Sequence, residues 1–371
     1  MRYIPVTELR GGEILANNII NSNMQVLIRE ETVITDKMIQ RIKRLGIKSI
    51  YIEDHDMQPF LKDCVMDTID TTIRNHSINK VKKSIEEFQG SVDKQKKTLK
   101  YSDSGSELFT SIKNISTDLV NEVLSAKSTS ISMLDIKSVS DYYYEHSVNI
   151  TVLSLIIGTE MGLSTDELES LAFGALLVDI GCNWLDKEVL LKESELDSSE
   201  FEKVKDHVQL GFEYITKNTI FNAHVKSIIM HHHERIDGSG YPSGLKGDNI
   251  HKLAKIVMVA DVYDALTSDR PYRRAYNQHE AIEYIMGRAG SLFDFDIANI
   301  FSRKVIPYPV GTYVKLSNNQ KGVITENNSN HPLRPVIRTF GESKYTSETS
   351  FQIDLLEVNN VTIEKVIYDL G

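Results

Sequence analysis

The stretch His231–Arg274 reads HHHERIDGSGYPSGLKGDNIHKLAKIVMVADVYDALTSDRPYRR, and the rest of the chain is best interpreted from it. It places three adjacent histidines, a glycine-rich loop, an apolar segment interrupted by aspartates, and a basic tip within one short run. Imidazoles and carboxylates bind divalent metals, and arginine side chains bind phosphates through planar, forked hydrogen bonds. The stretch therefore predicts a metal-assisted site for a phosphate-containing ligand.

The same stretch closely resembles the signature of the HD-GYP family, the metal-dependent cyclic-di-GMP phosphodiesterases. Two motifs carry the resemblance at the family's spacing: the run HHERIDGSGYP and the downstream run DALTSDRPYR. The resemblance covers residues 140–305 strongly and the flanking segments only loosely. It implies an all-helical HD-type core, a divalent metal cofactor of the iron or manganese type, and cyclic-di-GMP as the ligand.

The composition of the whole chain limits the classes of partner. A net charge of −10 argues against nucleic acid and anionic membranes, since either needs a positive protein surface, whereas a small phosphate ligand needs only a local basic patch. Two cysteines, Cys64 and Cys182, cannot form a disulfide framework, which favours a reducing compartment. The first residues lack a basic-then-apolar signal pattern, and no apolar stretch is long enough to span a bilayer. We expect a cytoplasmic protein without membrane insertion.

Residues 136–305 read as a continuous helical domain, the predicted HD-GYP domain. Ser164 and Glu167 form a capping box that begins a helix running to about Ile180. Asn222 is suited to cap a helix that ends in the histidines. Further helices are predicted over 140–161, 197–217, 252–267, 280–288 and 295–301. Because no strand alternation interrupts this pattern, the core is predicted to be all-α.

The flanking segments predict three further units. Residues 1–54 read as a small α/β unit, with strands at Met24–Ile28 and Ser49–Ile52 and a helix between Thr35 and Gly46. Residues 55–135 form a helical connector, and residues 306–371 a small β-rich unit with strands at 312–316, 322–326, 336–340 and 351–355. The connector carries an apolar face that we expect to pack onto the same chain, with a partner protein as the alternative; its residues are Leu108, Ile112, Ile115, Leu119 and Val123.

The first unit carries no chemistry of its own. It is interpreted as a sensory, docking or dimerisation unit, with plain structural padding as the alternative. Other signalling proteins and a second copy of the chain are therefore candidate partners.

The candidate metal ligands come from separate segments. His232 and His233 are adjacent, so both can serve one cluster only at the end of a helix. Asp261 lies in the apolar run AKIVMVADVYDAL, where a carboxylate is costly unless it is paired or metal-bound, and Asp264 is the candidate supporting or arginine-paired residue beside it. A lone histidine is more often buried or exposed without a metal. The resemblance nevertheless implies ligand roles at six positions: His146, Asp179, His207, His232, His233 and Asp261.

The segment GALLVDIGCNW departs from the family pattern LLHDIGK. Asp179 matches the aspartate that bridges two metals, but Val178 stands at the histidine position and Cys182 at the lysine position. Tyr142 stands where some members carry a glutamate, which disfavours a third metal. One metal position then keeps Asp179, His207, His232 and His233. The other keeps His146, Asp179 and Asp261 and is one imidazole short, with Cys182 as a conceivable substitute ligand.

The ligand-binding residues are better preserved. By resemblance, Gly240 and Tyr241 belong to the loop that contacts the nucleotide, and Arg270 and Arg273 grip its phosphates. The first hypothesis is therefore an HD-GYP protein that binds cyclic-di-GMP with impaired or lost phosphodiesterase activity, acting as a receptor or regulator. The second is an active phosphodiesterase that yields pGpG or GMP. The third, a hydrolase of another phosphate ester, has no sequence support beyond the breadth of the family.

Overall fold

The computed structural model describes residues 1–20, 25–45, 47, 49–53, 71–93, 98–99, 103–126, 142–190, 192, 194–218, 222–268, 275–328, 330–340 and 351–368. Contacts divide the chain into two compact units. Unit 1 comprises Met1–Thr68, Ser130–Ser140 and Arg303–Gly371, and unit 2 comprises Ile69–Thr129 and Asp141–Ser302.

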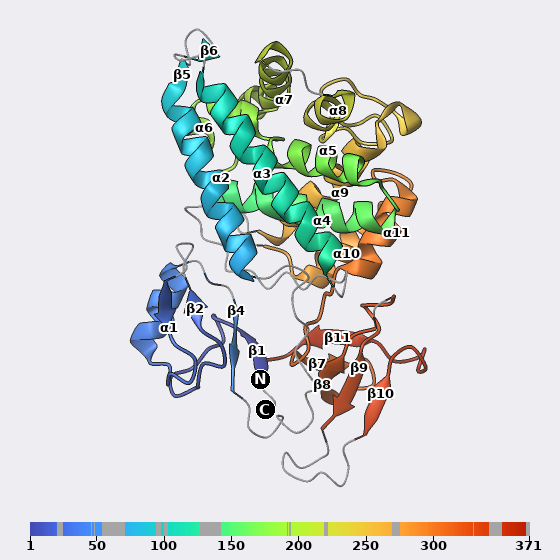
Figure 1. The fold of residues 1–371 in the computed structure, drawn as a ribbon. Helices are drawn as coiled ribbons and strands as arrows, with labels where there is room; N and C mark the ends of the chain where they lie inside the picture. Colours follow the sequence, from blue (N-terminus) through green and yellow to red (C-terminus); the bar gives the residue numbers. More distant parts are fainter. Residues whose placement is uncertain are drawn as a thin grey trace. The chain divides into compact units, whose positions relative to one another are not determined.

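Unit 2 is helical, which confirms the predicted mainly-α fold class with a helical HD-type core (Figure 1). Its short strands β5 (Val92–Asp93) and β6 (Thr98–Leu99) form a hairpin between the first two helices. No helix in the described part of the chain is long and apolar enough to cross a membrane. The helices of the unit, including two 3₁₀ turns, are α2 (Thr71–Ser91), α3 (Asp103–Ser125), α4 (Tyr142–Glu160), α5 (Thr165–Leu176), η2 (Ile180–Trp184), α6 (Lys187–Leu190), α7 (Ser198–Asn218), α8 (Ala223–His231), η3 (Gly247–Asn249), α9 (Lys252–Thr267), α10 (Gln278–Met286) and α11 (Phe295–Lys304).

Helix caps lie where the sequence predicts them. Ser164 and Glu167 form the capping box of α5, and the Asn222 side chain accepts a hydrogen bond from the Val225 backbone N–H, 3.1 Å, at the start of α8. The histidines follow directly, because α8 ends at His231 with His232 as its C-cap. Two imidazoles are thereby brought to a helix end, as their adjacency requires.

The predicted extension of α5 to about Ile180 is wrong. The helix ends at Leu176, and the chain then tightens into the 3₁₀ turn η2. Gly181 shows why: a Cβ at this position would lie 1.9 Å from the carbonyl oxygen of His207. The backbone of η2 is therefore pressed against the backbone of α7, an approach that only glycine permits. This turn places Asp179 beside the residues of α7.

Helices α2 and α3 lie side by side and pack onto the rest of unit 2 (Figure 1). The apolar face predicted on α3 is buried, which confirms that it packs onto the same chain: Leu108, Ile112, Ile115, Leu119 and Val123 are each at most 2% exposed. The α2 residue Phe88 joins an aromatic cluster with Trp184 of η2 and Tyr214 of α7, with ring centroids 5.0–5.8 Å apart. The connector helices thus share their core with the helices that follow.

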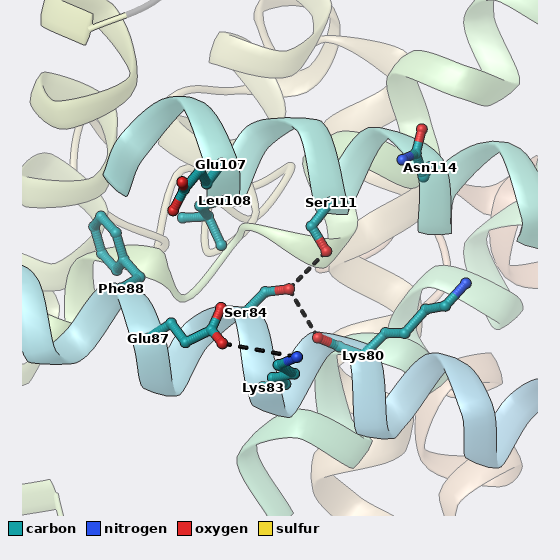
Figure 2. Close-up of a pocket in the computed structure, with 9 residues that line it drawn as sticks. All are labelled: Lys80, Lys83, Ser84, Glu87, Phe88, Glu107, Leu108, Ser111 and Asn114. Atoms are coloured by element: carbon teal, nitrogen blue, oxygen red, sulfur yellow. Dashed lines mark hydrogen bonds and ion pairs between the residues drawn. The ribbon is translucent and has the colours of Figure 1, made fainter. Parts of the chain in front are cut away.

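A hollow of about 300 Å³ lies between α2 and α3, and none of the candidate metal ligands lines it (Figure 2). Its floor is held by a hydrogen bond of 2.6 Å between the hydroxyls of Ser84 and Ser111. Lys83 and Glu87 at its edge form an exposed ion pair, 3.9 Å.

Unit 1 contains the small sheets at both ends of the chain. Near the N-terminus, β1 (Arg2–Pro5) pairs antiparallel with β4 (Ser49–Ile52), and β2 (Ile19–Ile20) pairs with β3 (Val26–Ile28). The helix α1 (Asp36–Arg44) is capped by Thr35 as predicted. The sequence did not predict β1 and β2. Met24 and Gly46, named in the predicted strand and helix end, lie outside the described residues.

The C-terminal region forms a five-stranded antiparallel sheet in the order β10-β9-β8-β7-β11. Four of its strands overlap the predicted segments, and the edge strand β11 was not predicted. Residues of these strands are buried around one apolar core that includes Val314, Ile324 and Ile337. The strands are β7 (Tyr313–Leu316), β8 (Lys321–Glu326), β9 (Val336–Thr339), β10 (Gln352–Asp354) and β11 (Ile363–Val366).

Candidate metal centre

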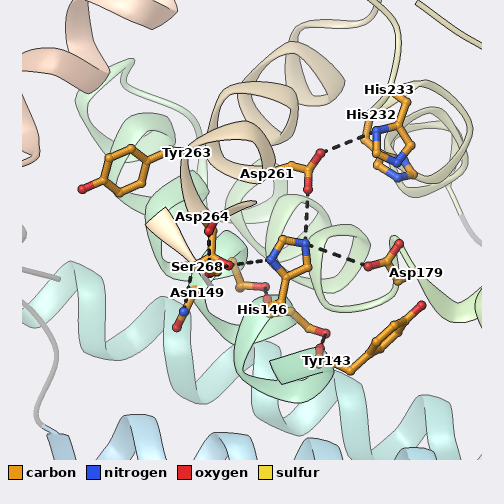
Figure 3. Close-up of polar contacts among 12 residues, drawn as sticks. Tyr143, His146, Asn149, Asp179, His232, His233, Asp261, Tyr263, Asp264 and Ser268 are labelled. Atoms are coloured by element: carbon orange, nitrogen blue, oxygen red, sulfur yellow. Dashed lines mark hydrogen bonds and ion pairs between the residues drawn. The ribbon is translucent and has the colours of Figure 1, made fainter. Parts of the chain in front are cut away.

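Two pairs of residues, each three positions apart, face each other between α4 and α9. His146 and Asn149 lie on one face of α4, and Asp261 and Asp264 lie on one face of α9. The His146 imidazole bridges the two carboxylates, with Nδ1 2.6 Å from Asp264 Oδ2 and Nε2 3.2 Å from Asp261 Oδ1 (Figure 3). All four residues are at most 7% exposed, so these contacts form in a largely dry environment.

Asp264 fixes the orientation of the His146 ring. Its carboxylate accepts a hydrogen bond from Asn149 Nδ2, 2.8 Å, whereas the Ser268 hydroxyl donates its short hydrogen bond to the backbone carbonyl of Asp264, 2.6 Å. An ionised carboxylate only accepts, so the His146 Nδ1–H is the donor toward Asp264. Nε2 is then directed at Asp261 and, at 4.0 Å, at Asp179 Oδ2. A histidine held through Nδ1 by a carboxylate is the usual arrangement of an Nε2 metal ligand.

His207 and His232 meet through their other ring nitrogens. His207 Nδ1 lies 2.6 Å from the Val204 carbonyl oxygen, and His232 Nδ1 lies 2.9 Å from that of Ile229, so each Nδ1–H donates to its own helix. The two Nε2 atoms consequently carry lone pairs, yet they lie only 3.4 Å apart. Two nitrogens that each lie about 2.1 Å from one tetrahedral ion are separated by about 3.4 Å, so this spacing fits a shared metal.

His233 completes the group. The ligand nitrogens of His207, His232 and His233 all lie within 4.8 Å of one another. His233 Nδ1 also lies 3.5 Å from Asp261 Oδ2, which connects the three histidines to the α4–α9 residues (Figure 3). On its other side the ring stacks on Tyr241, with centroids 4.7 Å apart.

The electrostatics favour metal binding. Burial, reinforced by the neighbouring His207, lowers the pKa of His232 to about 4, and burial with the nearby His232 holds the pKa of His233 well below its ordinary value. Both rings are therefore neutral at neutral pH, the form that ligates metals. Burial acts to raise the pKa of Asp261, but its contact with the His146 imidazole holds the pKa below its usual range. Neutral imidazoles beside ionised carboxylates suit iron, manganese or zinc.

Asp179 lies between the two groups. Its Oδ1 is 3.5 Å from His207 Nε2, and its Oδ2 is 4.0 Å from His146 Nε2. We define the first half-site as His207, His232, His233 and Asp179 Oδ1, and the second half-site as His146, Asp261 and Asp179 Oδ2. A carboxylate with one oxygen toward each half-site has the geometry of a bridging ligand.

The residues beside Asp179 offer little to the second half-site. Val178 is buried and has no ligand atom. Cys182, the conceivable substitute ligand, is also buried, and burial together with the negative charge of Asp179 raises the pKa of its thiol well above the ordinary value. A neutral thiol is a poor ligand, so among the described residues the second half-site depends on one imidazole and two carboxylates.

The glycine-rich loop is shaped by a buried acid that sequence reasoning missed. Glu234 is fully buried, and its carboxylate accepts hydrogen bonds from the backbone N–H groups of Ser243, 2.8 Å, and Leu245, 3.0 Å. A Cβ on Gly240 would lie 2.3 Å from the Arg235 nitrogen, so glycine is needed for the loop to fold over this backbone. These contacts place Tyr241 against His233. An acid one residue after the histidines and before a glycine-rich run was the available signal.

Two further residues of this region, His231 and Asn149, have contacts that their positions in the sequence do not predict. His231 turns away from its two neighbours and lies 3.2 Å from the Ser227 hydroxyl. Asn149, which nothing in the sequence singled out, connects Asp264 to Arg74. Arg270 and Arg273, and the side chain of Tyr142, lie outside the described residues.

Comparison with known proteins identifies the helical region. Residues 129–297 match the model of the HD domain. The chain carries an HD domain. Residues 313–369 match the KOW domain associated with HD domains, and this match covers the C-terminal sheet. The resemblance to the HD-GYP family that was drawn from the sequence is confirmed.

The curated relatives are cyclic dinucleotide phosphodiesterases. The chain is 35% identical over 227 residues to the cyclic di-GMP phosphodiesterase PA4108 of Pseudomonas aeruginosa, covering 60% of this chain and 55% of that one. It is 39% identical over 140 residues to the cyclic di-GMP phosphodiesterase response regulator RpfG of Xanthomonas campestris, covering 38% and 37%. A 3'3'-cGAMP-specific phosphodiesterase 1 of Vibrio cholerae is 32% identical over 186 residues, covering 48% and 42%. The chain thus spans about half or less of the length of these relatives.

Proposed function

We propose that this chain binds cyclic di-GMP at its HD domain and hydrolyses it slowly or not at all, as a receptor or regulator in cyclic-di-GMP signalling. The ligand class is supported by the named relatives and by the GYP loop. The impaired hydrolysis is supported by one observation: Asp179 presents an oxygen toward each half-site, but its neighbour Val178 gives the second half-site no nitrogen.

The cofactor of the proposal is iron or manganese, with one position complete and the second deficient. The first half-site would hold the ion through His207, His232 and His233 with Asp179; a bound ion there supplies Lewis-acid activation of water and phosphate. Hydrogen bonds from Nδ1–H to backbone carbonyls orient His207 and His232 so that their Nε2 atoms face each other. The second half-site would hold an ion with His146 and the carboxylates, more weakly because one imidazole is lacking.

The remaining residues of the proposal act on the ligand. Tyr241 stacks on His233 and carries a phenol beside the cluster, where it is suited to contact a base or phosphate. Arg270 and Arg273 would pair with the phosphates, and Cys182 supplies no charge at the position where the family has a lysine. Loss of an imidazole and of that cation predicts a rate about 10³-fold below an intact site. A cytoplasmic location, and signalling proteins or a second copy as partners, belong to the same proposal.

The alternative is an active phosphodiesterase that yields pGpG or GMP. It is favoured by the convergence of four imidazoles and two carboxylates in one cluster. In this case the second half-site, despite its missing imidazole, would suffice for hydrolysis.

Two measurements on the purified chain separate these functions. A binding isotherm for labelled cyclic di-GMP is combined with chromatography of the products after incubation with Mn²⁺ or Fe²⁺. Saturable binding with little product supports the proposal, and turnover near about 1–10 s⁻¹ supports the alternative. Absence of binding contradicts both. Unlabelled 3'3'-cGAMP as a competitor shows which cyclic dinucleotide binds more tightly.

A further inference from the structure

A chain of polar contacts leads from the connector helix α2 to the candidate metal centre. Arg74 on α2 donates a hydrogen bond from Nη2 to Asn149 Oδ1 on α4. The same amide donates from Nδ2 to Asp264 Oδ1 on α9, 2.8 Å, and Asp264 Oδ2 accepts from His146 Nδ1, 2.6 Å. Four side chains from three helices are thus connected in series, and the last holds its Nε2 toward Asp261.

The chemistry of the four groups fixes the direction of the chain. An amide between a guanidinium and a carboxylate must turn its oxygen to the cation and its nitrogen to the anion. Asn149 therefore has one orientation as long as Arg74 is present. In that orientation the Asn149 N–H₂ group donates to Asp264 Oδ1, and Asp264 Oδ2 accepts the hydrogen bond from His146.

Burial makes the chain costly to break. Asp264 is fully buried, and Asn149 and His146 are 1% and 5% exposed. A buried carboxylate requires nearby positive charge and complete hydrogen bonding. Arg74 is half-buried at the solvent side of the chain, so its charge reaches Asp264 through one polarised amide.

We infer that Arg74 is a positioning residue for the metal centre: through Asn149 and Asp264 it sets the orientation of His146, the single imidazole of the second half-site. This inference rests on the proposed function for its consequence, metal binding, but not for its geometry. Because Arg74 belongs to α2, which follows the N-terminal α/β unit in the sequence, a displacement of α2 would change the second half-site and leave the backbone-held rings of His207 and His232 in place.

The test compares Arg74→Met, Arg74→Lys and Lys83→Met with the unmodified full chain. Lys83 lies on the same helix, is 79% exposed, and pairs only weakly with Glu87, so it is the matched control for loss of a cation. The first readout is the exchange rate of the His146 Nδ1–H proton in metal-free protein, measured by NMR with ¹⁵N-labelled histidine. The second is Mn²⁺ affinity, measured by competition with a fluorescent chelator.

In Arg74→Met, we expect the exchange rate of the His146 Nδ1–H proton to rise on the order of tenfold. The dissociation constant of Mn²⁺ at the second half-site should rise by a similar factor, which is typical for loss of a residue that orients a metal ligand. Arg74→Lys, which keeps a cationic donor, should recover part of the loss, and Lys83→Met should match the unmodified chain. Unchanged proton exchange in a folded Arg74→Met or Arg74→Lys variant overturns the inference. If the unmodified chain binds no Mn²⁺ while the exchange still responds to Arg74, the proposed function fails and the positioning role stands.

Discussion

The two half-sites that share Asp179 are built by different means. In the first, His207 and His232 are each fixed by a carbonyl oxygen of their own helix, so their orientation follows from local backbone structure. In the second, His146 is fixed by Asp264 of α9, which in turn accepts a hydrogen bond from Asn149 of α4. The first half-site has three imidazoles, whereas the second has one. The second half-site therefore has fewer imidazoles, and the orientation of its imidazole depends on contacts between residues far apart in the sequence.

Under the proposed function, the complete first half-site serves ion and ligand binding, and the deficient second half-site limits catalysis. In the proposed account, valine at position 178 leaves the second half-site one ligand short, while the hydrogen bonds that orient His146 through Asp264 and Asn149 are present. A site in this condition should hold one ion firmly and a second weakly. Because the hydrogen bonds around His146 are already in place, adding the imidazole at position 178 and the cation at position 182 should require no other change to the fold.

The largest expected effect comes from restoring those groups. Val178→His combined with Cys182→Lys should raise cyclic-di-GMP hydrolysis about 10³-fold, since an imidazole and a phosphate-contacting cation are returned. Product chromatography at saturating Mn²⁺ measures the rate, and Cys182→Lys alone is the control for the effect of charge. An unchanged rate in the folded double variant would mean that the second half-site is limited by something other than these side chains.

Removing one imidazole from each half-site should have unequal consequences for the tighter ion. His207→Ala should weaken its binding by more than about a hundredfold, because loss of a direct ligand exceeds the effect of losing a supporting residue. His146→Ala should change the affinity of this ion by less than about threefold. Chelator competition measures both, and equal losses would contradict the division into two half-sites.

The close approach of η2 to α7 can be tested through its glycine. Gly181→Ala introduces a methyl group 1.9 Å from the His207 carbonyl oxygen and should lower the free energy of unfolding by about 1–3 kcal/mol or more. It should also weaken metal binding by moving Asp179 from His207. Gly90→Ala, with open space around its Cβ position, is the control and should stabilise α2 by about 0.5–1 kcal/mol. Denaturant unfolding with and without Mn²⁺ distinguishes the two effects.

The smallest effect is expected at Cys182. Cys182→Ala should leave both metal affinities within about twofold, because a buried thiol with a raised pKa is not a ligand. A larger loss in the chelator competition would show that the thiolate substitutes for the missing imidazole.

Local signals predicted much of the fold. The capping residues Ser164 and Asn222 marked helix starts correctly, because a cap depends only on a side chain and the N–H groups of the next turn. The early end of α5 was not foreseen, since it depends on backbone contact between Gly181 and the distant α7. Short strands such as β1 and β11 also escaped, because their pairing partners lie far away in the sequence.

The candidate site divides in the same way. Its six proposed ligands were assigned by resemblance to the HD-GYP family, and the structure brings them into one cluster. Their ligand roles stay a prediction. The supporting residues Asn149 and Arg74 were missed, because an amide or a cation on a helix has no distinctive pattern until its partner from another segment is known. Glu234 was missed although its position between the histidines and the glycine-rich run was a signal.

The metal content of the chain tests the central claim most directly. The unmodified protein and Val178→His are loaded with Mn²⁺, passed over a desalting column, and analysed for metal per chain by mass spectrometry. The account predicts about one retained ion in the unmodified chain and about two in Val178→His, matching a complete and an incomplete half-site. Two equally retained ions in the unmodified chain would contradict it.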